Sequence, residues 1–522
     1  MRPRSEWLVR LAMAGIVVFT SMLYLKDLGR APVYLGWDEA RTAMQGYSLA
    51  TTGRDMTGHP APLFFHITDP LLPNHESVTW WQPLLFYLTA AVLRVAPLAM
   101  WSVRLPNVAL AVLNVWLAYA VARRLFANSW YAVLAALMLA LTPAHFFFAR
   151  LAQDYFLPQT FALLWLWCLL RYLQSDNAWL AAAAGFILGA GLYTHISSWI
   201  VMPFYLAVTN VVFWFSGKPR RANVALCLGF GAALLPMAAW LPYHPSLLQD
   251  MFTNYNVATT LKLSERLNLY WEYFNPSYLF FSGGADLMWA TRFAGVFLLA
   301  IAVLLPCGIW AIRQRQFSIP HALLFVGFFF APVPIVATLP DAPEYATARD
   351  LLVIPFGVLI SVAGVQFLLS NRRPLGRVLV ALLLVSIPVE FASFARDYFG
   401  GYQLRSAFRH DFLNVRGVVE SVIATDTATP VPAVYLSDDL SAGKVVQWQF
   451  HLTTHKRPDL WDRTRYFSIA EFKPTDIPSG SLLVLNIKDR RLTDLVGPDR
   501  CSVVQIVDDV TGTPAAAVLR RN

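Results

Sequence analysis

Long apolar segments separated by short polar connections occupy the chain up to about residue 398. Several of these segments run for roughly 17 to 22 residues with almost no charge, which is the length needed to cross a hydrocarbon core of about 30 Å. Lipid offers no hydrogen-bond partner to the backbone, so each such segment must be a helix unless the chain forms a closed barrel. The pattern predicts about eleven membrane-spanning helices, at 8–25, 102–122, 129–148, 157–173, 179–194, 197–215, 223–241, 291–311, 319–339, 351–369 and 377–395.

The apolar stretch "PLLFYLTAAVLRVAPLAM" (83–100) does not fit this series, because it contains Arg94 and two prolines. Counting it as a span would invert every later connection and place the arginine-rich ones outside the cell. We therefore predict an interfacial helix within the first outer loop.

The composition changes near residue 399, where polar sequence replaces the apolar segments. Short β-like runs, "PAVYL", "SLLVLNI" and "CSVVQIV", alternate there with helix-like stretches. The pattern predicts a soluble α/β domain at 399–522. Residues 1–398 would form a mainly α, polytopic membrane domain with large outer loops at 26–101 and 242–290.

The distribution of basic residues predicts how the chain is oriented. Arginine and lysine are concentrated in connections that all fall on one side of the predicted spans, at 2–10, 123–124, 171, 218–221, 313–315 and 372–377. The positive-inside rule assigns that side to the cytoplasm. We therefore expect a multi-pass protein of the inner or plasma membrane with a cytoplasmic N-terminus and an extracytoplasmic C-terminal domain. The basic, apolar start of the chain is interpreted as an uncleaved first span.

The overall composition supports a membrane protein and excludes several classes of function. Hydrophobic residues make up 57% of the chain and charged residues only 14%, against about 25% charged in soluble domains. The net charge of +9 is spread over membrane connections, so it does not indicate a nucleic-acid partner. Three of the four cysteines lie in apolar runs, which excludes a disulfide framework and a cysteine-based zinc site. The sequence has no Walker-type loop and no His-Glu-x-x-His motif, so no nucleotide cofactor is expected.

Carboxylates and cations gather in the predicted outer connections. Asp38 and Glu39 follow the first span and precede a helix-like stretch, and an acidic pair in this position often simply caps a helix. Arg150 and Asp154 occupy the second outer loop, where an i, i+4 salt bridge is the simplest explanation. His195 lies in a tight turn between two spans, where a lone histidine is usually just a hydrogen-bonded interfacial residue.

The stretch "DAPEYATARDLLVIP" adds another polar group at the mouth of the tenth predicted span. Arg349 there would either anchor the helix at the interface or clamp a phosphate. Together, these residues provide carboxylates for a general base or metal ligand and cations for a phosphate. This combination suits glycosyl transfer from a lipid-phosphate donor, with or without a divalent ion.

Six motifs in order resemble the membrane-embedded GT-C glycosyltransferases that include protein O-mannosyltransferases and lipid A aminoarabinose transferases. They are "GWDEARTAMQGYSLATTGRD", "PLLFYL" leading to "WSVRLPNVALAVLNVWLAYAVARRLF", "LTPAHFFFARLAQD", "GLYTHISSWIVMP", "YFNPSYLFFSGGADL" and "YATARDLLVIP". The motifs cover roughly residues 30–360. The resemblance implies a GT-C fold and a bacterial transferase of unassigned substrate.

The resemblance also implies residue roles. Asp38 falls at the acidic position whose carboxylate acts as catalytic base, with Glu39 beside it, and Asp154 falls at the second acidic position. Arg349 resembles the arginine that faces the donor phosphate, and His195 stands where aminoarabinose transferases carry a phosphate-binding lysine.

Further roles are assigned on the same basis. Arg150 joins the donor-phosphate group, and substrate binding is assigned to His59, Tyr273 and Tyr345, of which Tyr273 replaces a histidine common in relatives. If a divalent metal ion is required, Asp38 and Asp154 are its expected ligands.

The implied function is transfer of a sugar from a polyprenyl-phosphate sugar to an extracytoplasmic lipid, glycan or protein acceptor, with inversion. The main alternative is a transporter or flippase of lipid-linked sugars, which would require charges deep in the spans and pseudo-symmetric halves. A non-catalytic scaffold and a polymerase of lipid-linked oligosaccharides are further alternatives.

Overall fold

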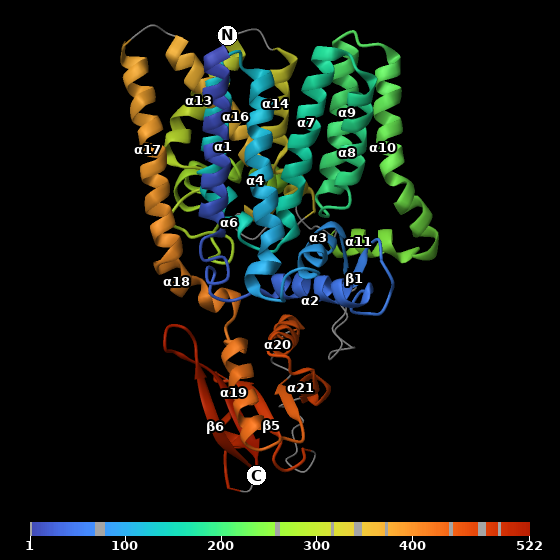
Figure 1. Ribbon diagram of the computed structural model, residues 1–522, viewed down its shortest axis with the longest axis vertical. Coiled ribbons are helices and arrows are strands. Elements are labelled where there is room, and N and C mark those ends of the chain that lie inside the picture. The colour runs from blue at the N-terminus through green and yellow to red at the C-terminus, as the bar shows by residue number, and fades with distance from the viewer. Residues whose placement is uncertain are drawn as a thin grey trace.

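The computed structural model consists of a helical bundle and a smaller sheet-containing domain at one end of it (Figure 1). The N-terminus lies at the opposite end of the bundle (Figure 1). The structure describes residues 3–67, 79–255, 262–314, 318–338, 347–370, 374–437, 442–467, 477–488, 492–498 and 500–522.

Each of the predicted spans corresponds to a helix or a pair of helices. They are α1 (Pro3–Leu25), α4 (Met100–Leu125), α5 (Ser129–Ala140) with α6 (Pro143–Ala149), α7 (Leu157–Ser175), α8 (Ala178–Gly191), α9 (Ser198–Phe215), α10 (Arg220–Trp240), α13 (Leu299–Gln314), α14 (Ile319–Phe330) with α15 (Val333–Thr338), α16 (Val353–Ser370) and α17 (Pro374–Phe399).

The structure does not confirm the count of eleven crossings. Among the described residues, eight helical segments are long and apolar enough to span a membrane, and a ninth is added if α5 and α6, bent by 60°, form one span. Helices α8 and α13 are apolar but have only 14 and 16 residues. A helix of 14 residues is about 21 Å long, which is less than the hydrocarbon thickness.

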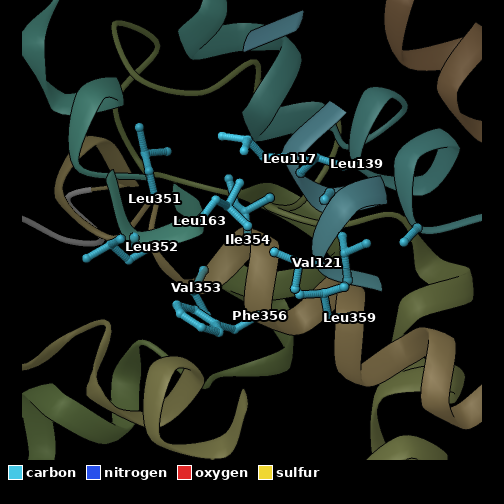
Figure 2. Packing of buried hydrophobic residues seen from close by; sticks show 14 of the residues in the cluster. Leu117, Val121, Leu139, Leu163, Leu351, Leu352, Val353, Ile354, Phe356 and Leu359 are labelled. Carbon is cyan, nitrogen blue, oxygen red and sulfur yellow. The ribbon is translucent and has the colours of Figure 1, made fainter. Parts of the chain in front are cut away.

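Helix α16 forms the centre of the bundle. Its residues are apolar on every side, and an all-round apolar helix is typical of a buried position. Ile354 and Leu359 of α16 belong to one apolar cluster with Val121 of α4 and Leu139 of α5 (Figure 2). The polar connections at the helix ends are therefore held on a rigid apolar core.

Glycines bring α8 and α10 into close contact. A Cβ atom at Gly185 would lie 1.9 Å from the carbonyl oxygen of Leu226, and one at Gly229 would lie 2.0 Å from that of Ala182. Small residues at helix crossings allow such close approach in membranes. The short helix α8 is thereby fixed against its neighbour, which positions the turn that follows it.

A layer of short elements covers the end of the bundle nearest the C-terminal domain (Figure 1). It contains α2 (Trp37–Thr52), β1 (Phe65–Ile67) paired with β2 (Thr79–Trp81), α3 (Leu84–Leu93), η3 (Leu241–Tyr243), α11 (Ser246–Tyr255), α12 (Leu263–Glu272) and the π-helical turn η4 (Ser277–Ser282). Helix α3 has ten residues, about 15 Å, and packs against α2 and α4. It is too short to cross a membrane, as the interfacial interpretation of residues 83–100 requires.

The C-terminal region forms a five-stranded mixed sheet in the order β4-β3-β5-β7-β6. Its elements are α18 (Gly401–His410), α19 (Val415–Ala428), β3 (Val434–Ser437), α20 (Ala442–Thr454), α21 (Pro458–Asp462), β4 (Thr464–Phe467), β5 (Leu482–Asn486), α22 (Leu492–Leu495), β6 (Cys501–Asp508) and β7 (Pro514–Arg521). The three predicted strands are β3, β5 and β6. Strand β7 begins Pro-Ala-Ala-Ala, which has little strand preference, but it lies between β5 and β6.

Helix α20 joins the two parts of the molecule by packing on α2. Val446 and Phe450 of α20 are buried in one apolar cluster with Leu35, Ala43 and Met44. Hydrogen bonds reinforce the contact: the Gln447 amide donates to the carbonyl of Leu35, and the backbone N–H of Val510 donates to the Tyr34 hydroxyl at 3.2 Å. The C-terminal domain therefore holds the residues that lead into α2.

Candidate active site

The acidic pair lies in the first turn of α2, directly after its first residue, Trp37. Gly36 caps the helix in an extended conformation, and its N–H donates to the carboxylate of Glu39 at 3.0 Å. Carboxylates in a first turn are favoured by the positive end of the helix dipole. The helix ends at Gly53, whose φ of +70° suits glycine. Asp38 and Glu39 are thus fixed at the N-terminal end of α2.

Glu39 is fully buried and all its described contacts are structural. Its carboxylate forms a two-pronged ion pair with Arg104 of α4, at 2.8 and 3.0 Å, and also accepts the N–H of Ala152 at 2.9 Å. Burial raises the pKa of Glu39, but Arg104 and the hydrogen bonds outweigh this effect and hold the pKa below its usual value. The remaining Arg104 donors bind the carbonyls of Leu28, Pro32 and Tyr34. Glu39 and Arg104 therefore position the start of α2.

Asp38 is buried but has no comparable partner. Its nearest described cation is Arg41, with Nη1 at 3.7 Å from Oδ1, and Arg41 in turn lies over the ring of Trp37. Burial, with a contribution from Glu39, outweighs the opposing effects of Arg41 and Arg349 and raises the pKa of Asp38 to about 6. A carboxylate with such a pKa is suited to accept a proton near neutral pH.

Asp154 and Arg349 approach Asp38 from two other elements. Asp154 begins the short helix η2 (Asp154–Phe156), and Arg349 ends η5 (Thr347–Arg349). The charges of Asp38 and Asp154 repel one another, and each carboxylate interacts electrostatically with Arg349. Three residues far apart in the sequence therefore form one cluster, with two carboxylates near one guanidinium.

His195 lies at the same cluster, in the turn between α8 and α9. Its Nδ1 accepts the N–H of Ser197 at 3.2 Å, so in the neutral ring the proton is on Nε2. Its ring also packs against Tyr155 at 4.8 Å between centroids. Burial and the nearby Arg349 hold the pKa of His195 well below its ordinary value. His195 is therefore a neutral hydrogen-bond donor rather than a cation.

Arg150 does not join this cluster. Helix α6 ends at Ala149, so the expected i, i+4 pairing with Asp154 does not form. The Arg150 guanidinium is fully buried, donates to the carbonyls of Tyr24 and Ala31 and stacks on the ring of Phe399 at 5.0 Å. The structure thus places it among α1 and α17, where it acts as a structural crosslink.

The structure describes two of the three predicted substrate-binding residues. His59 is exposed in the turn after α2, beyond a helix of 16 residues or about 24 Å, and contacts Asp55 and Thr57. Tyr273 is fully buried after α12, with its ring against Tyr278. Tyr345 lies outside the described residues. These three assignments remain predictions.

An apolar groove lies between helices of the bundle, and its lining includes one cation, Arg266 of α12. It has a volume of about 710 Å³ and lies between α9, α12, α14 and α15. Tyr270, one of its lining residues, is close enough to Asp350 for the two to interact electrostatically. Asp350 directly follows Arg349 and accepts a hydrogen bond from Tyr278 at 3.2 Å. Tyr270 and Asp350 thus link the groove to the residue that follows Arg349.

The described residues contain no group of three or more His, Cys, Asp or Glu side chains that could hold a metal ion. Asp38 and Asp154 alone are two oxygen-ligand residues, so a divalent ion between them would need water or substrate to complete its coordination. The metal requirement therefore remains a prediction.

Two residues of the site were not predicted as site residues, Arg41 and Arg104. Arg104 is a single charge within an otherwise apolar segment, and such a charge is costly to keep inside a membrane. The energetic cost of burying this charge is the sequence feature that could have indicated a structural role for Arg104.

The fold and the cluster define a polytopic membrane protein with its polar site at the end of the bundle nearest a soluble domain. Residues 80–243 match the family described as dolichyl-phosphate-mannose-protein mannosyltransferase. No curated protein matches the sequence of the chain.

Solved structures share the fold, in the case of ArnT over nearly the full chain. ArnT from Cupriavidus metallidurans in the apo state is similar with a TM-score of 0.59 and 15% identity, over 99% of this chain and 98% of ArnT. The structure of the same protein bound to undecaprenyl phosphate has a TM-score of 0.56 and 13% identity, over 98% of each chain. A third similar structure is the oligosaccharyltransferase AglB from Archaeoglobus fulgidus in complex with an inhibitory peptide and a dolichol-phosphate. Its TM-score is 0.51 and its identity 12%, over 85% of this chain and 64% of AglB. The GT-C fold indicated by the sequence motifs is thus confirmed, and the family and structural relatives are glycosyltransferases.

Proposed function

We propose that this protein transfers a sugar from a polyprenyl-phosphate donor to a hydroxyl or amino group of an acceptor. The observation that carries the proposal is the convergence of Asp38, Asp154 and Arg349. Support also comes from the fold shared with ArnT bound to undecaprenyl phosphate and with AglB bound to a dolichol-phosphate.

The proposed reaction is a single displacement with inversion. The acceptor atom attacks the anomeric carbon of the sugar and gives its proton to Asp38, while the bond from that carbon to the phosphate oxygen breaks. The electron pair leaves with the polyprenyl phosphate, whose charge is stabilised by Arg349 and by the Nε2–H of His195. Asp154 keeps Arg349 oriented through their mutual attraction.

A flippase of lipid-linked sugars is the competing function. It requires charges within the spans that line a path across the bundle. The buried charges Arg104 and Arg150 are instead saturated by structural contacts. This arrangement favours a transferase.

The test is transfer of label from radiolabelled polyprenyl-phosphate sugars (mannose, glucose, arabinose and galacturonate in parallel) to a membrane extract containing the purified protein. Label on a product would support the transferase and identify the sugar. If no donor gives a product and labelled donor instead equilibrates between the two leaflets of vesicles, the flippase is correct.

Transfer should fall on the acid side of about pH 6. Asp38 accepts a proton only as a carboxylate, and its pKa is raised to about 6. Below that pH, kcat/KM should decrease about tenfold per pH unit, because the free enzyme loses its base. The profile is measured between pH 4.5 and 8. A constant kcat/KM across pH 5 to 7 would contradict the role of Asp38.

Arg349→Gln should lower transfer by about 10²- to 10³-fold, as loss of a group that stabilises developing charge typically does. Arg349→Lys should recover part of the activity, because lysine retains the charge but not the planar fork that binds phosphate at two points. Donor saturation curves would show both effects. Arg94→Gln, at an exposed cation beyond the end of α3, is the matched control. Equal activity of Arg349→Gln and this control would refute the assignment.

A further inference from the structure

A second groove lies on the outside of the bundle, between α1 and α17. Helix α1 packs on α4 and α5, whereas α17 packs on α13, α16 and α18. The groove that results has a volume of about 950 Å³, and Leu137 and Leu141 of α5 are among its lining residues. Both helices run the length of the bundle (Figure 1), so the groove follows the direction of a lipid chain.

The lining is apolar except at one end. Small residues on both helices, including Ala12, Gly15, Ala392 and Ala395, keep the groove deep. At Gly15 an added Cβ atom would meet no other atom within 4 Å. The charged lining residues are Lys26, directly after α1, and Arg396, in the last turn of α17. Both belong to the helix ends nearest the C-terminal domain.

The two cations form no ion pair with any carboxylate in the part of the chain that the structure describes. The neighbouring Arg405 differs, since it binds Asp397 at 2.8 Å. The ammonium of Lys26 lies 4.8 Å from the ring centroid of Phe399, at the edge of the groove. Long basic side chains at helix ends commonly extend to the membrane interface. Two of them above one apolar groove also match the charge and shape of an anionic lipid.

The groove is separated from the proposed catalytic cluster. Behind its lining residue Phe399 lies the buried Arg150, which stacks on the ring and binds the carbonyls of Tyr24 and Ala31. A lipid in this groove would not reach Asp38. The carrier lipid of the reaction must reach Asp38, so this second groove suits a lipid that takes no part in the transfer.

We infer that the groove binds one anionic glycerophospholipid, with its phosphate between Lys26 and Arg396 and its acyl chains along α1 and α17. Bound in this way, the lipid would bridge α1 and α17, which pack on different helices of the bundle. Helix α1 leads into residues 27–36 and α17 leads into α18, so the bridge would stabilise both connections to the soluble domain.

The test is lipid binding to the purified, delipidated full chain in detergent, measured by native mass spectrometry. Phosphatidylglycerol should be retained about tenfold better than phosphatidylcholine, since each basic residue near a phosphate contributes appreciably to binding an anionic lipid. The double variant Lys26→Gln/Arg396→Gln should lose this preference, and Arg94→Gln should keep it.

A second variant tests the groove without changing charge. Gly15→Leu places a side chain in the open space of the groove and should reduce phosphatidylglycerol retention. Gly231→Leu is the matched control, because it adds the same side chain to α10, where there is also no atom within 4 Å. Both variants are checked for unchanged thermal stability in detergent.

Three results would overturn the inference. Equal retention of the two phospholipids by the unmodified protein would mean annular lipid only. Unchanged retention in both groove variants would place the lipid elsewhere. Preferential displacement of phosphatidylglycerol from the groove by a polyprenyl phosphate would assign the groove to the carrier lipid. None of these readouts depends on transferase activity.

Discussion

The variant Asp38→Asn is expected to lose transfer by about 10²- to 10⁴-fold, the range usual for removal of a general base. Its fold should remain intact, because the nearest described cation of Asp38 is 3.7 Å away and Glu39 keeps the helix start in place through Arg104. Removing a buried negative charge that lacks a strong partner should not destabilise the protein. Initial rates with labelled donor, together with thermal denaturation in detergent, measure the two effects.

The control for this variant is Asp27→Asn, which makes the same chemical change at an exposed aspartate after α1. It should leave both rate and stability unchanged. Donor binding to Asp38→Asn should persist, since Arg349 is retained. Transfer by Asp38→Asn at more than about a tenth of the normal rate would remove Asp38 from the mechanism.

The variant Arg104→Met is expected to show the largest loss of stability, about 3–5 kcal/mol, which is typical when one partner of a buried ion pair is removed. Glu39 would keep its charge in a fully buried position, and three carbonyls would lose their donor. Transfer should decline as well, because the start of α2 is no longer fixed. Thermal denaturation in detergent measures the stability.

Two further variants separate the buried charge from other effects. Glu39→Gln/Arg104→Met removes both charges and should recover part of the lost stability, because a neutral pair costs less to bury. Arg123→Met changes another arginine of α4 whose ion pair with Glu6 is partly exposed, and exposed pairs contribute at most about 1 kcal/mol. If Arg104→Met and Arg123→Met are equally stable, the Glu39–Arg104 pair does not hold α2.

The membrane part of the fold could be predicted because its signals are local. Apolar length indicated where helices occur, and the basic connections indicated which segments cross. The number of spans does not follow from apolar length, since α8 and α13 are shorter than a typical span and the helix pair α5 and α6 bends by 60°. These features depend on packing against neighbouring helices, as the glycine contacts between α8 and α10 show.

The sequence predicts part of the site cluster, but the direction of each side chain depends on where the helices begin and end. Asp38, Asp154 and Arg349 come from three separate connections, and only a shared face of the bundle suggested that they meet. The direction of Arg150 could not be predicted, because a helix that ends one residue earlier sends its side chain into the core. The same limit applies to Glu39, whose partner Arg104 is 65 residues away in the sequence.

The contact between α20 and α2 means that the two domains cannot simply be separated at residue 399, where the composition changes. Leu35, Ala43 and Met44 belong by sequence to the membrane part, yet they are buried against Val446 and Phe450. A chimera that exchanges the soluble domain alone would leave these side chains facing a foreign surface. A functional exchange would therefore have to keep the face of α20 that contacts α2, because α2 itself is tied to the bundle through Glu39 and Arg104.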